Sequence, residues 1–346
     1  MARPLRIERP GAWYHITARG NERRPIYRDP RDRQHFCELL AETADRFRLV
    51  LHAYVLMDNH FHLILETLEP NLSQAMPWLN VSYSVWFNRR HGRAGHLFQG
   101  RYQAILVDPL GWGLELSRYV HLNPVRVGRL GLDKAAQQRN RVGAVAAPNP
   151  AEVRERIGVL RRYRWSSYRA YVGLARKPAW LQCQTVLQFL GGGPGKVREA
   201  YRNHVESAVR QGWPESPWER LTAQGVLGGA DFVRAVRQGV RGNPREQKAL
   251  RAWRERPTLP KVIATVEKLK GEAWMDFRDR YGDWGRDLVL YLGRRTCGLK
   301  LKGLAEVAGG IDYVSVSAAV KRWKDRMAKE PGLAAILSQA EKMLQI

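Results

Sequence analysis

Residues 50–66 read VLHAYVLMDNHFHLILE, and this stretch decides the fold. It contains two runs of mostly apolar side chains, Val50–Met57 and His60–Glu66, which predict two β-strands. Only Asp58 and Asn59 separate the runs, so the natural interpretation is a tight β-hairpin. Because a hairpin pairs its strands antiparallel, the sheet that contains it has antiparallel neighbours.

Strands and helices alternate on both sides of this hairpin. In chain order, the flanking elements that the pattern predicts are a strand at Trp13–Ala18, helices at Arg31–Arg48 and Leu72–Arg89, a strand at Gln103–Val107 and a helix at Trp112–Asn123. The last helix stops at Pro124, because a residue before proline is pushed out of the α region. This order favours an α+β fold, with helices packed on one face of a small antiparallel sheet.

The later part of the chain has a different character. The glycine-rich run Gly191–Gly195 is the clearest domain boundary, and no strand alternation is found beyond it. The segments with helical periodicity there are Ala230–Gly239, Leu259–Lys270, Arg286–Cys297 and Ser315–Ala328. We therefore expect an all-α C-terminal region, and a chain divided into residues 1–190, a helical connecting region at 191–280 and a last domain at 281–346.

The charge of the chain points to a polyanionic partner. Lys and Arg number 58 against 33 Asp and Glu, which gives a formal net charge of +25. Such an excess is typical of nucleic-acid-binding proteins. A ribosome-associated or membrane-surface protein would share it.

Cysteine spacing and hydropathy exclude several other classes. The three cysteines lie far apart and form no CxxC pair, which argues against a disulfide framework and a zinc ribbon. The first residues contain no signal-like apolar region, and no apolar run approaches the about 20 residues of a membrane span. We expect a cytoplasmic protein with no membrane partner.

Two histidines on the second strand of the hairpin are candidates for metal binding. His60 and His62 flank Phe61, and side chains alternate across a strand, so both imidazoles face the same side, with Cα atoms about 7 Å apart. That spacing suits two ligands on one metal ion. The alternative is a pair of half-buried histidines with a purely structural role.

The helix at Trp112–Asn123 supplies a second candidate pair. Tyr119 and Asn123 are four residues apart and therefore emerge on the same helix face. Asn123 offers an amide oxygen as a further hard ligand, and Tyr119 offers a phenol. The alternative for a helical tyrosine is a core position with a hydrogen-bonded hydroxyl.

Taken together, these elements resemble a specific family. Residues 1 to about 185 are similar to the single-tyrosine HUH transposases (the IS200-like family), and most closely to the REP-associated tyrosine transposase branch. The stretches that carry the resemblance, in the family's order, are Trp13–Asn21, Met57–Leu63, Gly95–Tyr102, Arg118–Arg126 and Trp165–Tyr168.

The resemblance implies a fold and an activity. The fold is a ferredoxin-like or RRM-like antiparallel sheet. His60 and His62 would bind a divalent metal, Mg²⁺ or Mn²⁺, Asn123 would complete its site, and Tyr119 would be the nucleophile. The activity is a metal-dependent endonuclease and strand transferase that acts on single-stranded, hairpin-forming DNA repeats through a 5′-phosphotyrosine.

Several further side chains are candidates for DNA contact. Those near the implied site in sequence, which could line a single-strand groove combining charge and stacking, are Arg19, Arg23, Arg24, Arg101 and Tyr102. Any one of the arginines could equally belong to a solvated basic face. We also expect residues after about 190 to bind DNA and to be dispensable for the chemical step.

The last domain has a resemblance of its own. Gly309–Val316 is similar to the helix-turn-helix of the bacterial replication initiator, which implies contact with duplex DNA. The recognition helix would be Ser315–Arg326, presenting Ser315, Ser317, Lys321 and Arg322. The alternative is a plain helical bundle.

Two other functions stay open at this point, as does the choice between a monomer and a dimer. One is a sequence-specific DNA-binding regulator whose HUH domain is inactive. The other is an RNA-binding protein, since a similar sheet serves in RNA recognition.

Overall fold

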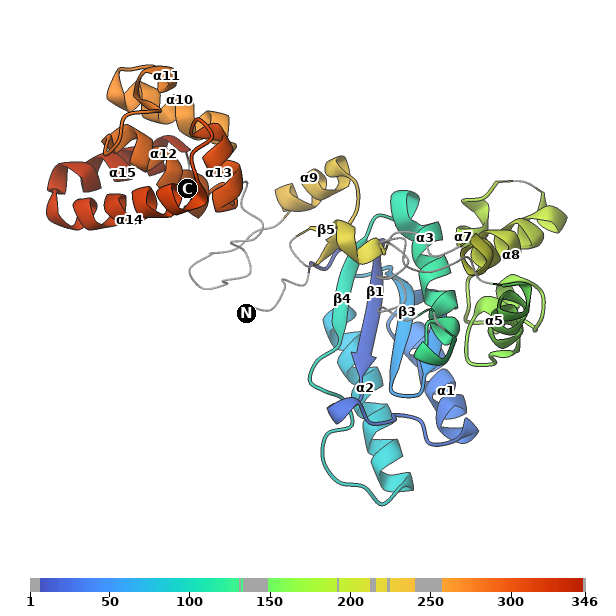
Figure 1. Ribbon diagram of the computed structural model, residues 1–346. Helices are drawn as coiled ribbons and strands as arrows, with labels where there is room; N and C mark the ends of the chain where they lie inside the picture. The colour runs from blue at the N-terminus through green and yellow to red at the C-terminus, as the bar shows by residue number, and fades with distance from the viewer. Residues whose placement is uncertain are drawn as a thin grey trace. The chain divides into compact units, whose positions relative to one another are not determined.

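The computed structural model describes residues 7–130, 132, 149–191, 193–211, 216–222, 225–239 and 257–344. The chain divides into two compact units, Met1–Trp253 and Arg254–Ile346 (Figure 1). This boundary differs from the three-part division expected from the glycine-rich run, because the structure after residue 190 continues to pack within the first unit.

A six-stranded, mostly antiparallel sheet forms the centre of the first unit. In chain order its strands are β1 (Ala12–Arg19), β2 (Leu49–Met57), β3 (His60–Thr67), β4 (Gln103–Val107), β5 (Leu221–Thr222) and β6 (Val226–Leu227). They lie in the order β2-β3-β1-β4-β6-β5, and only the β4–β6 pairing is parallel. The first four strands alternate with two helices in the ferredoxin-like order, so the α+β prediction is confirmed.

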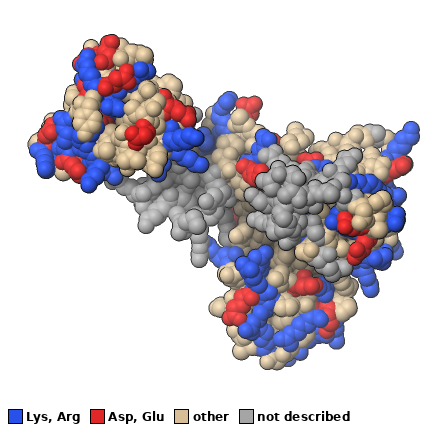
Figure 2. Space-filling model, in the orientation of Figure 1, with Lys and Arg blue, Asp and Glu red and all other residues tan. Residues whose placement is uncertain are grey.

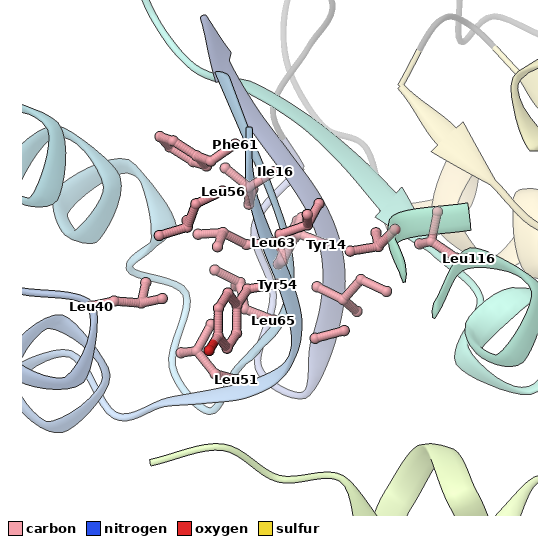
Figure 3. Close-up of a cluster of buried hydrophobic side chains, with 14 of the residues drawn as sticks. Tyr14, Ile16, Leu40, Leu51, Tyr54, Leu56, Phe61, Leu63, Leu65 and Leu116 are labelled. Atoms are coloured by element: carbon pink, nitrogen blue, oxygen red, sulfur yellow. The ribbon is translucent and has the colours of Figure 1, made fainter. Parts of the chain in front are cut away.

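Helices α1 (Pro30–Arg46) and α2 (Leu72–Arg90) cover one face of this sheet. The fully buried ring of Phe36 on α1 lies 4.9 Å from that of Phe61 on β3 and 5.0 Å from that of Tyr83 on α2, measured between centroids. Figure 3 shows the core on this side, with Ile16, Leu56, Phe61 and Leu63 turned toward one another.

The expectation that helices occupy one face holds only for α1 and α2. Helix α3 (Pro109–Leu122) lies against the opposite face, where Tyr119 meets the rings of His15 and His62. The sequence pattern could not distinguish the faces, because an amphipathic helix packs equally well on either side of a sheet whose strands are buried on both faces.

The expectation of an all-helical chain beyond Lys196 is wrong at one point. The short strands β5 and β6 join the sheet edge at β4, where Leu106 N donates to Gly225 O (2.8 Å) and Asp108 N to Leu227 O (2.8 Å). Two-residue strands are too short to show alternation, so the sequence carried no signal for them.

The remaining described helices of the first unit follow α3 along the chain. They are 3₁₀ helices η2 (Asn123–Val125), η3 (Gly128–Leu130) and η4 (Pro217–Arg220), and helices α5 (Pro150–Arg162), α6 (Tyr168–Tyr171), α7 (Gln184–Gln188), α8 (Pro194–Gln211) and α9 (Ala230–Gly239). Another 3₁₀ turn, η1 (Asn21–Arg23), follows β1.

Helices joined by short loops make up the described residues 257–344 of the second unit. Its helices are α10 (Leu259–Lys270), α11 (Trp274–Phe277), α12 (Trp284–Arg295), α13 (Leu301–Val307), α14 (Tyr313–Lys329) and α15 (Pro331–Leu344). Gly309 and Gly310 have φ values of 85° and 78°, a left-handed conformation that glycine adopts without strain between α13 and α14. Within the part of the chain that the structure describes, no helix is long and apolar enough to cross a membrane.

A buried hydrogen-bond network fixes helix α3. Both ring nitrogens of His121 are engaged, Nε2 with Ser167 Oγ (2.7 Å) and Nδ1 with Tyr201 Oη (2.7 Å). Ser167 in turn accepts from Tyr54 N of β2 (2.9 Å), and Tyr201 donates to Ser117 Oγ of α3 (2.8 Å). His121 is therefore a structural residue that ties α3 to β2 and α8.

This network predicts a dependence of stability on pH. Desolvation lowers the pKa of His121 to about 3, whereas an unfolded histidine titrates near 6.5. The unfolded chain therefore binds more protons between these values, so stability falls as pH drops below about 6.5, by about 2 kcal/mol at pH 5 for this one group.

The measurement is urea unfolding near pH 7.5 and near pH 5. A His121→Gln variant, which cannot gain the proton, loses about 2 kcal/mol less on acidification than the wild type does. Equal losses in the two proteins would contradict the assignment of this proton to His121.

Candidate functional site

A pocket of about 630 Å³ opens on the face of the sheet that carries α3. Its lining comes from β1, β3, β4, the loop before β4, α3, η4 and β5, and comprises His15, Thr17, Ala18, Arg19, His60, His62, Gln99, Arg101, Gln103, Ile105, Tyr119, Trp218 and Leu221. Three of the four candidates for chemistry, His60, His62 and Tyr119, thus share one pocket.

The sheet register places the two histidines. His60 stands opposite Arg19 and His62 opposite Thr17 in the antiparallel pairing of β3 with β1. Their rings are 5.0 Å apart between centroids, at 78° to each other. The shared face that strand alternation predicted is therefore observed, and Phe61 between them is fully buried on the other side.

A hydrogen bond to one ring nitrogen of His60 indicates where its hydrogen lies. Asn59 Nδ2 donates to the Arg23 carbonyl (2.9 Å), which leaves Asn59 Oδ1 as an acceptor 2.7 Å from His60 Nδ1. An amide oxygen can only accept, so Nδ1 of His60 carries the hydrogen in this contact. The lone pair of His60 is then on Nε2.

His15 is a site residue that the sequence analysis missed. Its Nε2 lies 2.9 Å from Nδ1 of His62, and both side chains are buried. If the hydrogen is on His62 Nδ1, His15 accepts it and His62 keeps a lone pair on Nε2, as His60 does. The two residues are diagonal neighbours on β1 and β3, a relation that only the strand register reveals.

Burial keeps the three imidazoles neutral. Desolvation lowers the pKa of His15 to about 3 and, with help from Arg19, that of His60 to about 4. Desolvation, followed by the proximity of His15 and His60, holds the pKa of His62 well below its usual value. Neutral imidazole is the form that binds metals.

Tyr119 stands edge-on among several rings. Its ring centroid is 5.9 Å from that of His62 at 79°, 6.2 Å from that of His15 at 87°, and 4.8 Å from that of Trp218 at 85°. The guanidinium carbon of Arg126 lies 4.5 Å from the same centroid. This half-buried tyrosine is therefore part of the pocket, rather than the core residue of the alternative interpretation.

Asn123 is not brought into the pocket. Its Nδ2 donates to the carbonyls of Tyr119 (2.9 Å) and Val120 (3.2 Å), so the side chain turns back onto the last turn of its own helix. Among the described residues, no group of three or more His, Cys, Asp or Glu side chains is arranged to hold a metal ion. His60 and His62 both line the pocket, whereas Asn123 is not among its lining residues.

The structure separates the candidate DNA-contacting residues of the first unit. Arg19 and Arg101 are exposed and line the pocket. Arg23 and Arg24 are exposed on the turn after β1, outside the pocket lining, and Arg24 pairs with Glu22. Tyr102 is buried and its hydroxyl donates to the Leu72 carbonyl (3.2 Å), so it is a core residue and cannot stack on a base.

A similar division applies to α14 in the second unit. Ser315 and Lys321 are exposed. Arg322 instead forms a two-bond ion pair with the fully buried carboxylate of Asp287 on α12, at 2.6 and 2.7 Å. The Arg322 charge is therefore paired within the second unit. Figure 2 shows that basic and acidic side chains are interspersed over the face in view.

A comparison with protein-family models supports the resemblance found in the sequence. Residues 9–123 match the family model described as IS200-like transposase, and the resemblance is confirmed over this segment. A solved structure of the REP-associated tyrosine transposase bound to a REP hairpin is 15% identical, with a TM-score of 0.36, and the alignment covers 51% of this chain and 89% of that one. No curated protein sequence matches the chain.

Proposed function

Because residues 9–123 match the IS200-like transposases, we propose that this protein cuts and rejoins single-stranded, hairpin-forming DNA through a covalent bond to Tyr119. The observation that carries the proposal is the position of Tyr119. Its phenol lies edge-on to His62 in the same open pocket, which the neutral imidazole of His60 also lines.

The chemical step is a transesterification. The Tyr119 oxygen attacks the scissile phosphorus, a P–O bond to the tyrosine forms, and the P–O3′ bond breaks. The phenol proton leaves with the departing 3′ oxygen, which becomes a 3′-OH, while the 5′ side stays on Tyr119. Since the ester bond is exchanged and not hydrolysed, a 3′-OH can reverse the step and join strands without ATP.

Residues around Tyr119 prepare it for this attack. The Arg126 guanidinium carbon lies 4.5 Å from the ring centroid, where the cation is attracted to the ring and restrains it. The backbone position is fixed by the buried network of His121, two residues further along α3. A nucleophile held in place loses less entropy on reaching the reactive geometry.

The pocket fits a divalent metal of the kind that the family uses. His60 and His62 would hold it through Nε2, with His15 accepting the hydrogen of His62 Nδ1 as an outer partner that fixes ring orientation. Bound there, the ion would neutralise charge on the scissile phosphate. Two imidazoles suit Mn²⁺ at least as well as Mg²⁺, which prefers oxygen ligands. Asn123 could join them only if its side chain left its helix carbonyls.

The pocket rim supports binding of a single strand. Arg19 and Arg101 are exposed beside the histidines, where they can contact phosphates. The second unit would add duplex contacts through the exposed face of α14, which includes Ser315 and Lys321. A regulator with an inactive domain is less well supported, because His60, His62 and Tyr119 remain together in an open pocket.

The first test replaces the nucleophile. We expect Tyr119→Phe to abolish the denaturant-resistant protein–DNA adduct formed with Mn²⁺ and a single-stranded hairpin, because the hydroxyl alone makes the bond. Hairpin affinity should stay within about twofold, since phosphate contacts dominate it. Tyr281→Phe, at a tyrosine 86% exposed in the second unit, is the matched control and keeps full activity. An adduct on the Tyr119→Phe protein would refute the assignment.

The second test concerns the metal. We expect His60→Ala and His62→Ala each to weaken Mn²⁺ binding by at least about tenfold in calorimetry, and to remove adduct formation, because each deletes a ligand. His35→Ala, on α1 and on the far face of the sheet, is the control and binds Mn²⁺ normally. Full adduct yield in excess chelator would exclude a metal-dependent mechanism.

The third test separates two neighbours on α14. Lys321→Ala should lower duplex affinity and reduce the salt slope by about one, as expected for one lost phosphate contact, with unchanged stability. Arg322→Ala should instead destabilise the second unit by about 3 kcal/mol, because it leaves the buried Asp287 carboxylate unpaired. A Lys321 variant with unaltered salt dependence would argue against this helix as the duplex-binding surface.

A further inference from the structure

We infer that Trp218 is a positioning residue for the nucleophile, so that the segment after residue 190 completes the active site. The inference rests on the proposed function, since it assigns a role in the attack by Tyr119. It stands against the expectation that the chain beyond residue 190 is dispensable for the chemical step, and the experiment below decides between the two.

Trp218 and Leu221 are the described residues beyond position 190 that line the pocket. Trp218 lies on η4, 99 residues beyond Tyr119 in sequence, and its ring meets the Tyr119 ring at 4.8 Å and 85°. The same ring lies 4.7 Å from that of His15, tilted by 31°. Trp218 therefore touches both the nucleophile and the hydrogen-bond partner of His62.

The segment that carries Trp218 is anchored to the sheet. Directly after η4, β5 and β6 follow, and the fully buried Val226 and Leu227 of β6 pair with the end of β4. Asp108, whose backbone N donates to Leu227 O, is also the residue whose side chain caps the N-terminus of α3. The strand that fixes the start of α3 thus belongs to the same segment as the side chain that contacts Tyr119.

Ring packing of this kind limits the rotamers of Tyr119. The Trp218 ring blocks movement of the Tyr119 ring in one direction. The Arg126 guanidinium, whose carbon lies 4.5 Å from the Tyr119 centroid, covers the Tyr119 ring. Removing the tryptophan frees the phenol to leave the reactive orientation, and misplacement of a reacting group by about 1 Å can cost about 100-fold in rate. A half-buried tryptophan at a DNA-binding pocket could also serve as a stacking platform for a base, and the experiment must separate these roles.

The experiment uses Trp218→Ala in the full chain under single-turnover conditions with Mn²⁺ and a single-stranded hairpin. We expect adduct formation to slow by about 10- to 100-fold, and rejoining by the same factor, because one tyrosine position serves both directions. The dissociation constants for Mn²⁺ and for the hairpin should stay within about twofold of the wild type. Trp218→Phe, which keeps a ring, should recover most of the rate.

A control variant and a replacement variant guard against a general loss of structure. Trp78→Ala deletes a tryptophan of similar partial exposure on α2, where it packs near Phe47 away from the pocket, and should leave the rate unchanged. If Trp218→Ala does not fold, as judged by circular dichroism and thermal melting, Trp218→Leu replaces it, since leucine keeps the apolar contact but lacks the ring.

A readout independent of activity follows the ring itself. With 3-fluorotyrosine incorporated at position 119 alone, the fluorine resonance should shift and sharpen in Trp218→Leu, because the ring current and the steric restraint of Trp218 are lost. An unchanged resonance together with an unchanged rate would overturn the inference. A loss confined to hairpin affinity would overturn it too, and would make Trp218 a stacking residue.

The proposed function and this inference can fail separately. A wild-type protein that forms no adduct would contradict the function, while the fluorine resonance would still show whether Trp218 orders Tyr119. A normal adduct on Tyr119 with a Trp218-independent rate would contradict only the inference.

Discussion

Phe61 is fully buried between Phe36 of α1 and Phe98, with ring centroids 4.9 and 6.1 Å away, and this packing decides which way β3 faces. A strand cannot turn one side chain inward without turning its neighbours outward. Burial of Phe61 therefore aims His60 and His62 at the opposite face. A one-residue slip of β3 against β1 would exchange the two sets and place imidazoles in the core.

Burying three imidazoles on the face of the sheet that carries the pocket has an electrostatic cost. A metal ion bound there would offset this cost. Desolvation of the three imidazoles lowers their pKa values, and the contact between His15 and His62 satisfies only one nitrogen of each. His15 Nδ1 is buried without a hydrogen-bond partner in the part of the chain that the structure describes. Polar groups held in this way are found at functional sites more often than in ordinary cores.

Helix α3 brings Tyr119 to this face from outside the four-stranded ferredoxin-like core. Its start is capped by Asp108, and its end is held by the His121 network. Later segments then close around it, through Tyr201 of α8 and Trp218 of η4. The unit that holds the pocket consequently extends well past the glycine-rich run at 191–195, which is a break in composition but not a break between compact units.

By itself the sequence determined most of the helices and strands around the pocket and three of the residues that line it together. Periodicity located β1 to β4 and α1 to α3, and the HFH tripeptide with Tyr119 indicated one site, because alternation and helical pitch are local properties of the chain. The tertiary structure alone decided the rest. It brought His15 to His62 through strand register, turned Asn123 onto its own helix and Arg322 onto Asp287, buried Tyr102, and carried Trp218 to Tyr119. These contacts join residues that periodicity cannot relate, since they depend on which surfaces become neighbours when the chain folds.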